Sequence, residues 1–269
     1  MEFSPVTPHV WRTVVEPATV TVGLIVGSSA SLLIDPGTSP AQGQAIRHAA
    51  RQITDLPLRS VVVTHGHWDH VNGLPAFADV ETIGHESLLP TADPVADTDS
   101  TDYPPVTLSQ PIASIAVRDL GDLTVEIAHF GRAHSRGDLI IAVPADRAFF
   151  VGDLIETAGP PQFDAASSVD GWVRSLDALH GLLKPGDTVI PGHGPTTDLW
   201  EVSHQRVGLA AIWDQTEWAF YRELPVDQIF DYDNLEWPWD RATAEAGIRL
   251  AYAELERRPK PKTPPQLFG

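Results

Sequence analysis

The sequence has no cysteine among its 269 residues. This absence excludes disulfide bonds, thiolate zinc fingers, a cysteine nucleophile and a thiolate metal ligand. A chain of this length needs no covalent staple, because it can bury a sizeable hydrophobic core. A metal in this protein must therefore be held by imidazole nitrogen and by oxygen.

Long hydrophobic runs are also missing. No stretch of apolar residues is long enough to span a bilayer, and the segment Met1–Val6 lacks the basic start and apolar stretch of a secretory signal. We therefore expect a soluble, cytoplasmic protein with no membrane partner.

Basic residues are scarce: 18 Lys and Arg stand against 36 Asp and Glu, and the formal net charge is -18. Proteins that bind nucleic acid draw much of their affinity from lysine and arginine that neutralise phosphates. The charge therefore argues against a nucleic-acid partner, and bound cations would offset part of the acidity.

What the sequence does contain is a dense group of metal-binding side chains in the segment 64–70. His65, His67, Asp69 and His70 follow the apolar run Val61–Val63 directly. Imidazole nitrogen and carboxylate oxygen are ligands that zinc prefers, and a tight loop after a strand can aim them at one point. The segment predicts a metal site, and the number of ligands favours two metals.

The order of predicted elements is strands, helix, strand, and then the same again. Periodicity predicts strands and helices in both halves. The first half contains strands at 10–15, 20–26 and 31–34, a helix at 41–56 and a strand at 61–63. The second half contains strands at 123–128, 139–143 and 148–151, a helix through 172–183 and a strand at 188–190. This order predicts an α/β fold in which two sheets stack between helices.

Beyond residue 197 the pattern becomes helical and rich in tryptophan. We expect a core at 1–197, a helical extension at 198–258 packed on it, and a disordered tail at 259–269. Five tryptophans of the extension could line a substrate pocket or could simply pack its helices: Trp200, Trp213, Trp218, Trp237 and Trp239. The proline-rich stretch 93–111 is a candidate lid.

Three later segments repeat the pattern of a ligand residue after an apolar strand, among glycines. They contain His134, Asp153 and His193. Together with the His-x-His-x-Asp-His motif at 65–70, they make the chain resemble the metallo-β-lactamase-fold hydrolase superfamily over residues 20–195. The resemblance implies a four-layer αββα sandwich of two mixed sheets, to which the helical extension is added.

The resemblance also implies a ligand set. A first metal would be held by His65, His67 and His134. A second metal would be held by Asp69, His70 and His193. Asp153 would bridge the two, which is similar to the glyoxalase II, lactonase and RNase Z branches, whereas the best-known β-lactamase branches use a cysteine or another residue there. The implied cofactors are two Zn²⁺ ions, with iron or manganese as alternatives.

Two further residues are candidates for supporting these ligands. Asp35 ends the strand at 31–34 and could orient a ligating imidazole, or it could be a turn residue. His129 lies at a strand end five residues before His134 and could likewise contact a ligand, or it could be an ordinary surface histidine.

Two metals that share an aspartate would also share a water whose pKa is lowered towards neutrality. The expected function is therefore a binuclear zinc hydrolase that attacks an ester, thioester or lactone of a small-molecule substrate with a zinc-bridging hydroxide, with Asp69 orienting the water or relaying a proton. Alternatives are a mononuclear iron persulfide dioxygenase of the same fold, a phosphodiesterase, a β-lactam hydrolase, or a metal-binding scaffold without turnover. Selectivity would lie in the loops, including the segment 156–170.

Overall fold

The computed structural model describes residues 1–89, 106–231 and 236–258. Most of the stretch 93–111 expected to form a lid, and the tail expected to be disordered, lie outside these residues. Among the described residues, no helix is both long and apolar enough to cross a membrane.

The strands of the described residues form one connected sheet of 12 strands with the path β7-β6-β5-β4-β3-β12-β11-β10-β9-β8, while β2 pairs with β1 and β3. The strands are β1 (Ser4–Pro5), β2 (Val10–Val15), β3 (Val20–Val26), β4 (Ser31–Ile34), β5 (Leu58–Val62), β6 (Glu81–His85), β7 (Gln110–Ile112), β8 (Ile115–Asp119), β9 (Thr124–His129), β10 (Leu139–Val143), β11 (Ala148–Glu156) and β12 (Thr188–His193).

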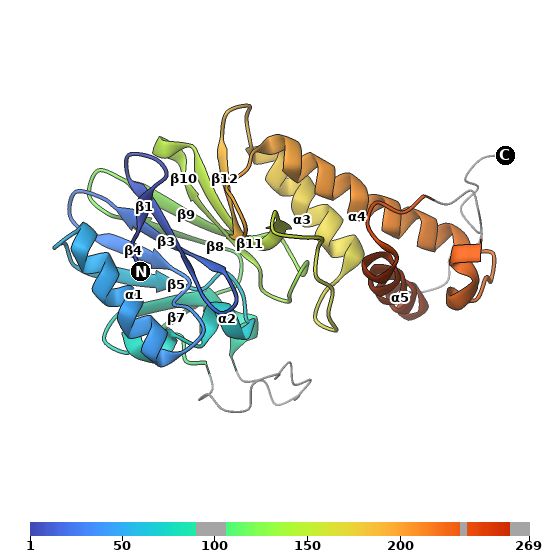
Figure 1. The fold of residues 1–269 in the computed structure, drawn as a ribbon, viewed down its shortest axis with the longest axis horizontal. Helices are drawn as coiled ribbons and strands as arrows, with labels where there is room; N and C mark the ends of the chain where they lie inside the picture. Colours follow the sequence, from blue (N-terminus) through green and yellow to red (C-terminus); the bar gives the residue numbers. More distant parts are fainter. Residues whose placement is uncertain (90–105, 232–235, 259–269) are drawn as a thin grey trace.

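Helices and short 3₁₀ turns connect and cover these strands. The helices are α1 (Pro40–Ile53), α2 (Trp68–Val71), α3 (Val169–Leu182), α4 (Leu199–Phe220) and α5 (Arg241–Arg257), and the 3₁₀ turns are η1 (Leu74–Phe77), η2 (Glu86–Leu88), η3 (Pro144–Asp146) and η4 (Val226–Asp231). Figure 1 shows α1 beside the N-terminal strands, and α3 and α4 beside the C-terminal strands.

Three apolar clusters account for the layers. One cluster joins residues of the N-terminal half, such as Leu32, to residues of the C-terminal half, such as Ile141, and so lies between the two halves of the sheet. A second packs α1 on the N-terminal half through Ile46, and a third packs α3 on the C-terminal half through Trp172. The four-layer α/β sandwich is confirmed.

The sequence led us to expect two separate sheets. In the structure the two halves are instead joined into one connected sheet. They meet where β12 pairs with β3 at a single position, His193 opposite Val20. Since His193 lies at this junction, a metal-binding side chain stands where the two halves of the sheet join. The junction thereby brings ligands from distant parts of the sequence to one place.

The C-terminal helices share an apolar cluster of their own. Trp213 is buried in it, and Trp218, Trp237 and Trp239 are partly buried against it. Trp200 is different, because 69% of it is exposed and its ring stacks on His204. Four of the five tryptophans thus pack helices.

Candidate metal centre

The first group of metal-binding side chains comes from two loops that follow strands and from one strand. His65 and His67 follow β5, His134 follows β9, and Asp153 lies in β11. The distances from Nδ1 of His67 to Nε2 of His65 and of His134 are 3.0 and 2.9 Å. Oδ2 of Asp153 lies 3.5 and 3.6 Å from those same Nε2 atoms. A tetrahedral zinc ion with bonds of about 2.05 Å holds its ligands about 3.3 Å apart, so these four atoms fit one ion.

The second group comes from α2 and β12. Nε2 of His193 lies 3.3 Å from Oδ2 of Asp69 and 3.4 Å from Nε2 of His70. Asp153 approaches this group as well, with Oδ1 3.3 Å from Nε2 of His70 and Oδ2 3.5 Å from Nε2 of His193. The separations again suit one ion.

The carboxylate of Asp153 gives the clearest indication that this site binds a cation. Its Oδ1 is buried, and no described residue donates a well-aligned hydrogen bond to it. Gly192 leaves the space for this carboxylate, since a side-chain carbon at that position would overlap Oδ1 of Asp153. A buried charged oxygen without a donor is costly unless a cation satisfies it.

Each of the five imidazoles turns its other ring nitrogen to a fixed oxygen. The partners are Oγ1 of Thr64 for His65 at 3.0 Å, Oδ2 of Asp164 for His67 at 2.8 Å, Oδ2 of Asp35 for His70 at 2.8 Å, the carbonyl of Gln162 for His134 at 3.2 Å, and the carbonyl of Ala18 for His193 at 3.1 Å. Such partners fix the ring orientation and the tautomer that presents a lone pair to a metal. The arrangement is that of a preformed metal-binding site.

Asp35 lies beneath the second group. It is 1% exposed, adopts a left-handed backbone conformation with φ 57°, and accepts hydrogen bonds from the amide and hydroxyl of Thr64. A non-glycine residue in this conformation stores strain that the surrounding contacts must offset. Asp35 thus contacts both Thr64 and the imidazole of His70.

His129 lies elsewhere. Its Nδ1 donates to the carbonyl of Asp138, and its ring packs on that of His85 with 4.0 Å between centroids. The carboxylate of Asp138 in turn accepts from the amide and hydroxyl of Ser135, which follows His134. The link from His129 to the metal-binding group is therefore indirect.

The loop between β11 and α3 was not expected to touch the ligands. Asp164 accepts from His67, and the hydroxyl of Ser167 donates to the carbonyl of His134 at 2.6 Å. Arg132 holds the loop by donating to the carbonyls of Ala165, Ala166 and Ser167. No sequence motif marks Asp164, although it falls in the segment expected to carry selectivity.

The pKa values of the histidines differ between the two groups. Burial, aided by nearby histidines, lowers the pKa of His65 well below its usual value, and burial also lowers the pKa of His134. Burial acts in the same sense on His193, but the carboxylates of Asp153 and Asp69 outweigh it and raise its pKa to about 10. For His70, Asp153 and Asp35 likewise outweigh burial and raise the pKa well above its usual value. Burial also acts to lower the pKa of His67, but the carboxylate of Asp164 outweighs it and raises this pKa. Without metal, the imidazoles of His65 and His134 are thus neutral, whereas those of His70 and His193 carry protons.

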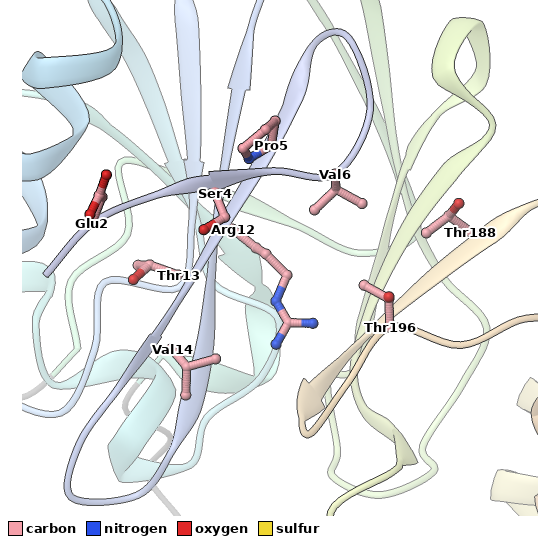
Figure 2. Close-up of a pocket in the computed structure, with 9 residues that line it drawn as sticks. All are labelled: Glu2, Ser4, Pro5, Val6, Arg12, Thr13, Val14, Thr188 and Thr196. Carbon is pink, nitrogen blue, oxygen red and sulfur yellow. The ribbon is translucent and has the colours of Figure 1, made fainter.

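Two open hollows lie outside this cluster. The larger, about 580 Å³, borders β2, and Figure 2 shows Arg12 reaching from β2 towards the chain that carries Thr196. The guanidinium donates to the carbonyl of Gly194 at 3.1 Å and so braces the loop that follows His193. The other, about 400 Å³, is lined in part by Glu156 and Glu201.

Comparisons with known proteins agree with this geometry. One relative is the hydroxyacylglutathione hydrolase of Ruegeria pomeroyi, 29% identical over 60% of this chain and 56% of that protein. Another is the type 2 metallo-beta-lactamase of Bacillus cereus, 22% identical over 65% of this chain and 68% of that protein. A linear primary-alkylsulfatase from a Pseudomonas species is 36% identical, but over only 19% of this chain and 10% of that protein.

Solved structures share the fold. A metallo-beta-lactamase from Pontibacter korlensis superposes with a TM-score of 0.64 at 20% identity, covering 78% of this chain and 98% of that one. The DIM-1 metallo-beta-lactamase superposes with a TM-score of 0.65 at 16% identity, covering 78% and 96%. Residues 15–193, which include every metal-binding side chain of the two groups, match the family model described as the metallo-beta-lactamase superfamily. The chain belongs to the metallo-beta-lactamase superfamily.

Proposed function

We propose that this member of the superfamily is a hydrolase that uses two divalent metal ions, zinc by preference, to cleave an ester, thioester or lactone. The observation that carries the proposal is the pair of ligand groups joined at Asp153, each with separations suited to one ion. In the proposed assignment, His65, His67 and His134 hold one ion and Asp69, His70 and His193 hold the other. Asp153 contacts both.

Two bound ions would supply a Lewis acid for the substrate carbonyl and a water whose pKa is lowered towards neutrality. The protein's own part is to hold five imidazoles rigidly, through the oxygen partners of their second nitrogens. Asp69 is 8% exposed and lies in α2 as a member of the second ligand group, and its carboxylate is the group proposed to orient the attacking water and relay its proton.

The choice of a carbonyl substrate over a β-lactam rests on chemistry and on one relative. The chain has no cysteine to serve as the ligand of the best-known β-lactamase branches, and it has Asp153 instead. The relative from Ruegeria pomeroyi is named for the hydrolysis of hydroxyacylglutathione. Trp68, which stands between His67 and Asp69 in the sequence, is 41% exposed, and we propose it as an apolar contact for the substrate.

The test is a substrate panel. The metal-loaded protein and its His67→Ala variant are assayed with thioesters, aryl esters, lactones, a β-lactam and a phosphodiester. Hydrolysis of at least one thioester, ester or lactone by the parent, with a loss of about 100-fold or more in the variant, is expected. Hydrolysis of the β-lactam or phosphodiester alone would refute the proposed substrate class. Oxygen uptake with a persulfide and iron in the protein would support the dioxygenase instead.

A further inference from the structure

Glu156, at the end of β11, is a buried carboxyl that the ligand set leaves out. It is 7% exposed. One of its oxygens lies with a ligand atom of Asp153 and one of His193 in a group whose members are all within 4.8 Å of one another. The nearby Oδ1 of Asp153 is the buried oxygen that lacks a well-aligned donor. Two buried carboxyls side by side repel each other unless a cation or a proton lies between them.

The backbone explains how Glu156 comes to face the ligands. Residues three apart on a regular strand point to opposite faces of a sheet, so Asp153 and Glu156 would ordinarily diverge. Here the pairing of β11 with β12 is irregular: Gly152 lies opposite Pro191, but Glu156 lies opposite His193. Four residues along β11 thus correspond to two residues along β12. This irregularity allows the carboxyls of Asp153 and Glu156 to lie on the same side of the sheet.

The irregular stretch is held in place by α4. Gln205, 3% exposed, accepts from the amide of Glu156 at 2.9 Å and donates to the carbonyl of Leu154 at 2.7 Å. The indole of Trp172 donates to the same carbonyl at 3.0 Å. Buried side chains that satisfy a distorted backbone in this way fix its geometry, so the position of Glu156 is built in.

Glu156 changes the donor set of the second group. His193 belongs to two overlapping groups, one with Asp69 and His70 and one with Asp153 and Glu156. Two imidazoles and three carboxylates thus surround this position, whereas the first group contains three imidazoles and Asp153. Carboxylate ligands and high coordination numbers suit harder ions such as Mn²⁺, while nitrogen-rich tetrahedral sites suit zinc. Glu156 also lines the hollow of about 400 Å³ together with Thr157 and Thr197, which gives water access to that side.

We propose that Glu156 is an additional ligand of the second metal, and that this position is suited to a harder ion of high coordination number such as Mn²⁺. The inference rests on the second metal position of the proposed function, but not on the reaction. Glu156 would complete an oxygen-rich position beside the nitrogen-rich position of His65, His67 and His134.

Binding of Mn²⁺ itself is the test. The metal-depleted protein receives one equivalent of Zn²⁺, and Mn²⁺ is then titrated while electron paramagnetic resonance reports the free hydrated ion. The parent is expected to bind one Mn²⁺ per chain, and Glu156→Gln to weaken the Kd at least about tenfold. Glu201→Gln is the matched control, because Glu201 lines the same hollow but belongs to neither ligand group. An unchanged Kd in Glu156→Gln would overturn the proposal.

A second measurement needs no variant. In a crystal of the parent protein soaked with Mn²⁺, anomalous scattering should place the ion with an oxygen of Glu156 at about 2.2 Å. An ion held by Asp69, His70 and His193 with the Glu156 carboxyl turned away would overturn the proposal even if Glu156→Gln fails to fold. Neither measurement involves turnover. A protein that binds Mn²⁺ through Glu156 but cleaves no ester would refute the proposed function alone.

Discussion

Oδ2 of Asp164 accepts a hydrogen bond from Nε2 of His67 at 2.8 Å. The other oxygen of Asp164 accepts from the amides of Ala166 and Ser167, both at 2.8 Å, so the carboxylate cannot rotate freely. His67 is the one imidazole of the first group that turns Nδ1 towards its fellow ligands, and it is also the most exposed of the three. Asp164 is therefore the residue that fixes this ring.

Replacing Asp164 by Asn should weaken metal binding at the first position. The amide retains the size of the side chain but loses the charge that fixes the His67 tautomer, and loss of such partners typically costs about 10–100-fold in metal affinity. Competition with a chromophoric chelator measures the change. Asp214→Asn, at an exposed site on α4, is the control and should leave the affinity unaltered. Equal affinities in Asp164→Asn and the parent would show that Asp164 does not position His67.

Metal binding should release more protons at the second position than at the first. At the first position, His65 and His134 have lowered pKa values and are neutral before the metal arrives, and only the pKa of His67 is raised. At the second position, the pKa values of both His70 and His193 are raised and their protons must leave. Calorimetric titration with zinc at pH 7, in buffers of different ionisation enthalpy, counts the protons. The first equivalent should release at most about one proton, from His67, and the second about two, from His70 and His193. Equal release from both equivalents would contradict the assigned charge states.

The metal-free protein should lose stability as the pH rises, in part because of Glu156. Burial, and then the charge of Asp153, raise the pKa of Glu156 from 4.5 to about 8. A group whose pKa is raised on folding contributes its full stability below the unfolded value and loses it as the pH rises through the folded value. The free energy of unfolding should therefore fall between pH 4.5 and pH 8.

The Glu156→Gln variant should lack the part of this decrease in the free energy of unfolding that is due to Glu156. Urea denaturation with a chelator present measures it. Gln resembles the protonated carboxyl, so the variant should match the parent near pH 4.5 and exceed it by about 5 kcal/mol above pH 8. Glu201→Gln should follow the parent at every pH. A Glu156→Gln variant that is no more stable than the parent at high pH would show that Glu156 is not a strained acid in the metal-free fold.

The side chains that gather at the candidate metal centre could be predicted from the sequence, because each stands next to an apolar strand and small residues. His65 follows β5, Asp153 lies within β11 and His193 ends β12, and the buried apolar residues of these strands are easily read from hydrophobicity. The αββα layering followed from the order of the elements. The short helix α2 within the motif was missed, since four residues are too few to show helical periodicity.

Apart from Asp35, the residues that surround the proposed ligands could not be predicted in the same way. Gln162 and Ala18 contribute backbone carbonyls, which any residue type can offer. The position of Asp164 depends on a folded loop, and that of Glu156 depends on an irregular strand pairing. Neither feature produces a periodic pattern in the sequence. Tertiary contacts from α4 decide where Glu156 points, so the relevant information lies about 50 residues away in Gln205.

The most direct test of the central claim is hydrolysis measured against metal content. The chelator-treated protein is titrated with zinc, metal per chain is determined by elemental analysis, and the rate of hydrolysis of the best ester, thioester or lactone is followed at each step. The account predicts no hydrolysis without metal and a maximal rate at two ions per chain. Full hydrolysis by protein that holds no metal would contradict it.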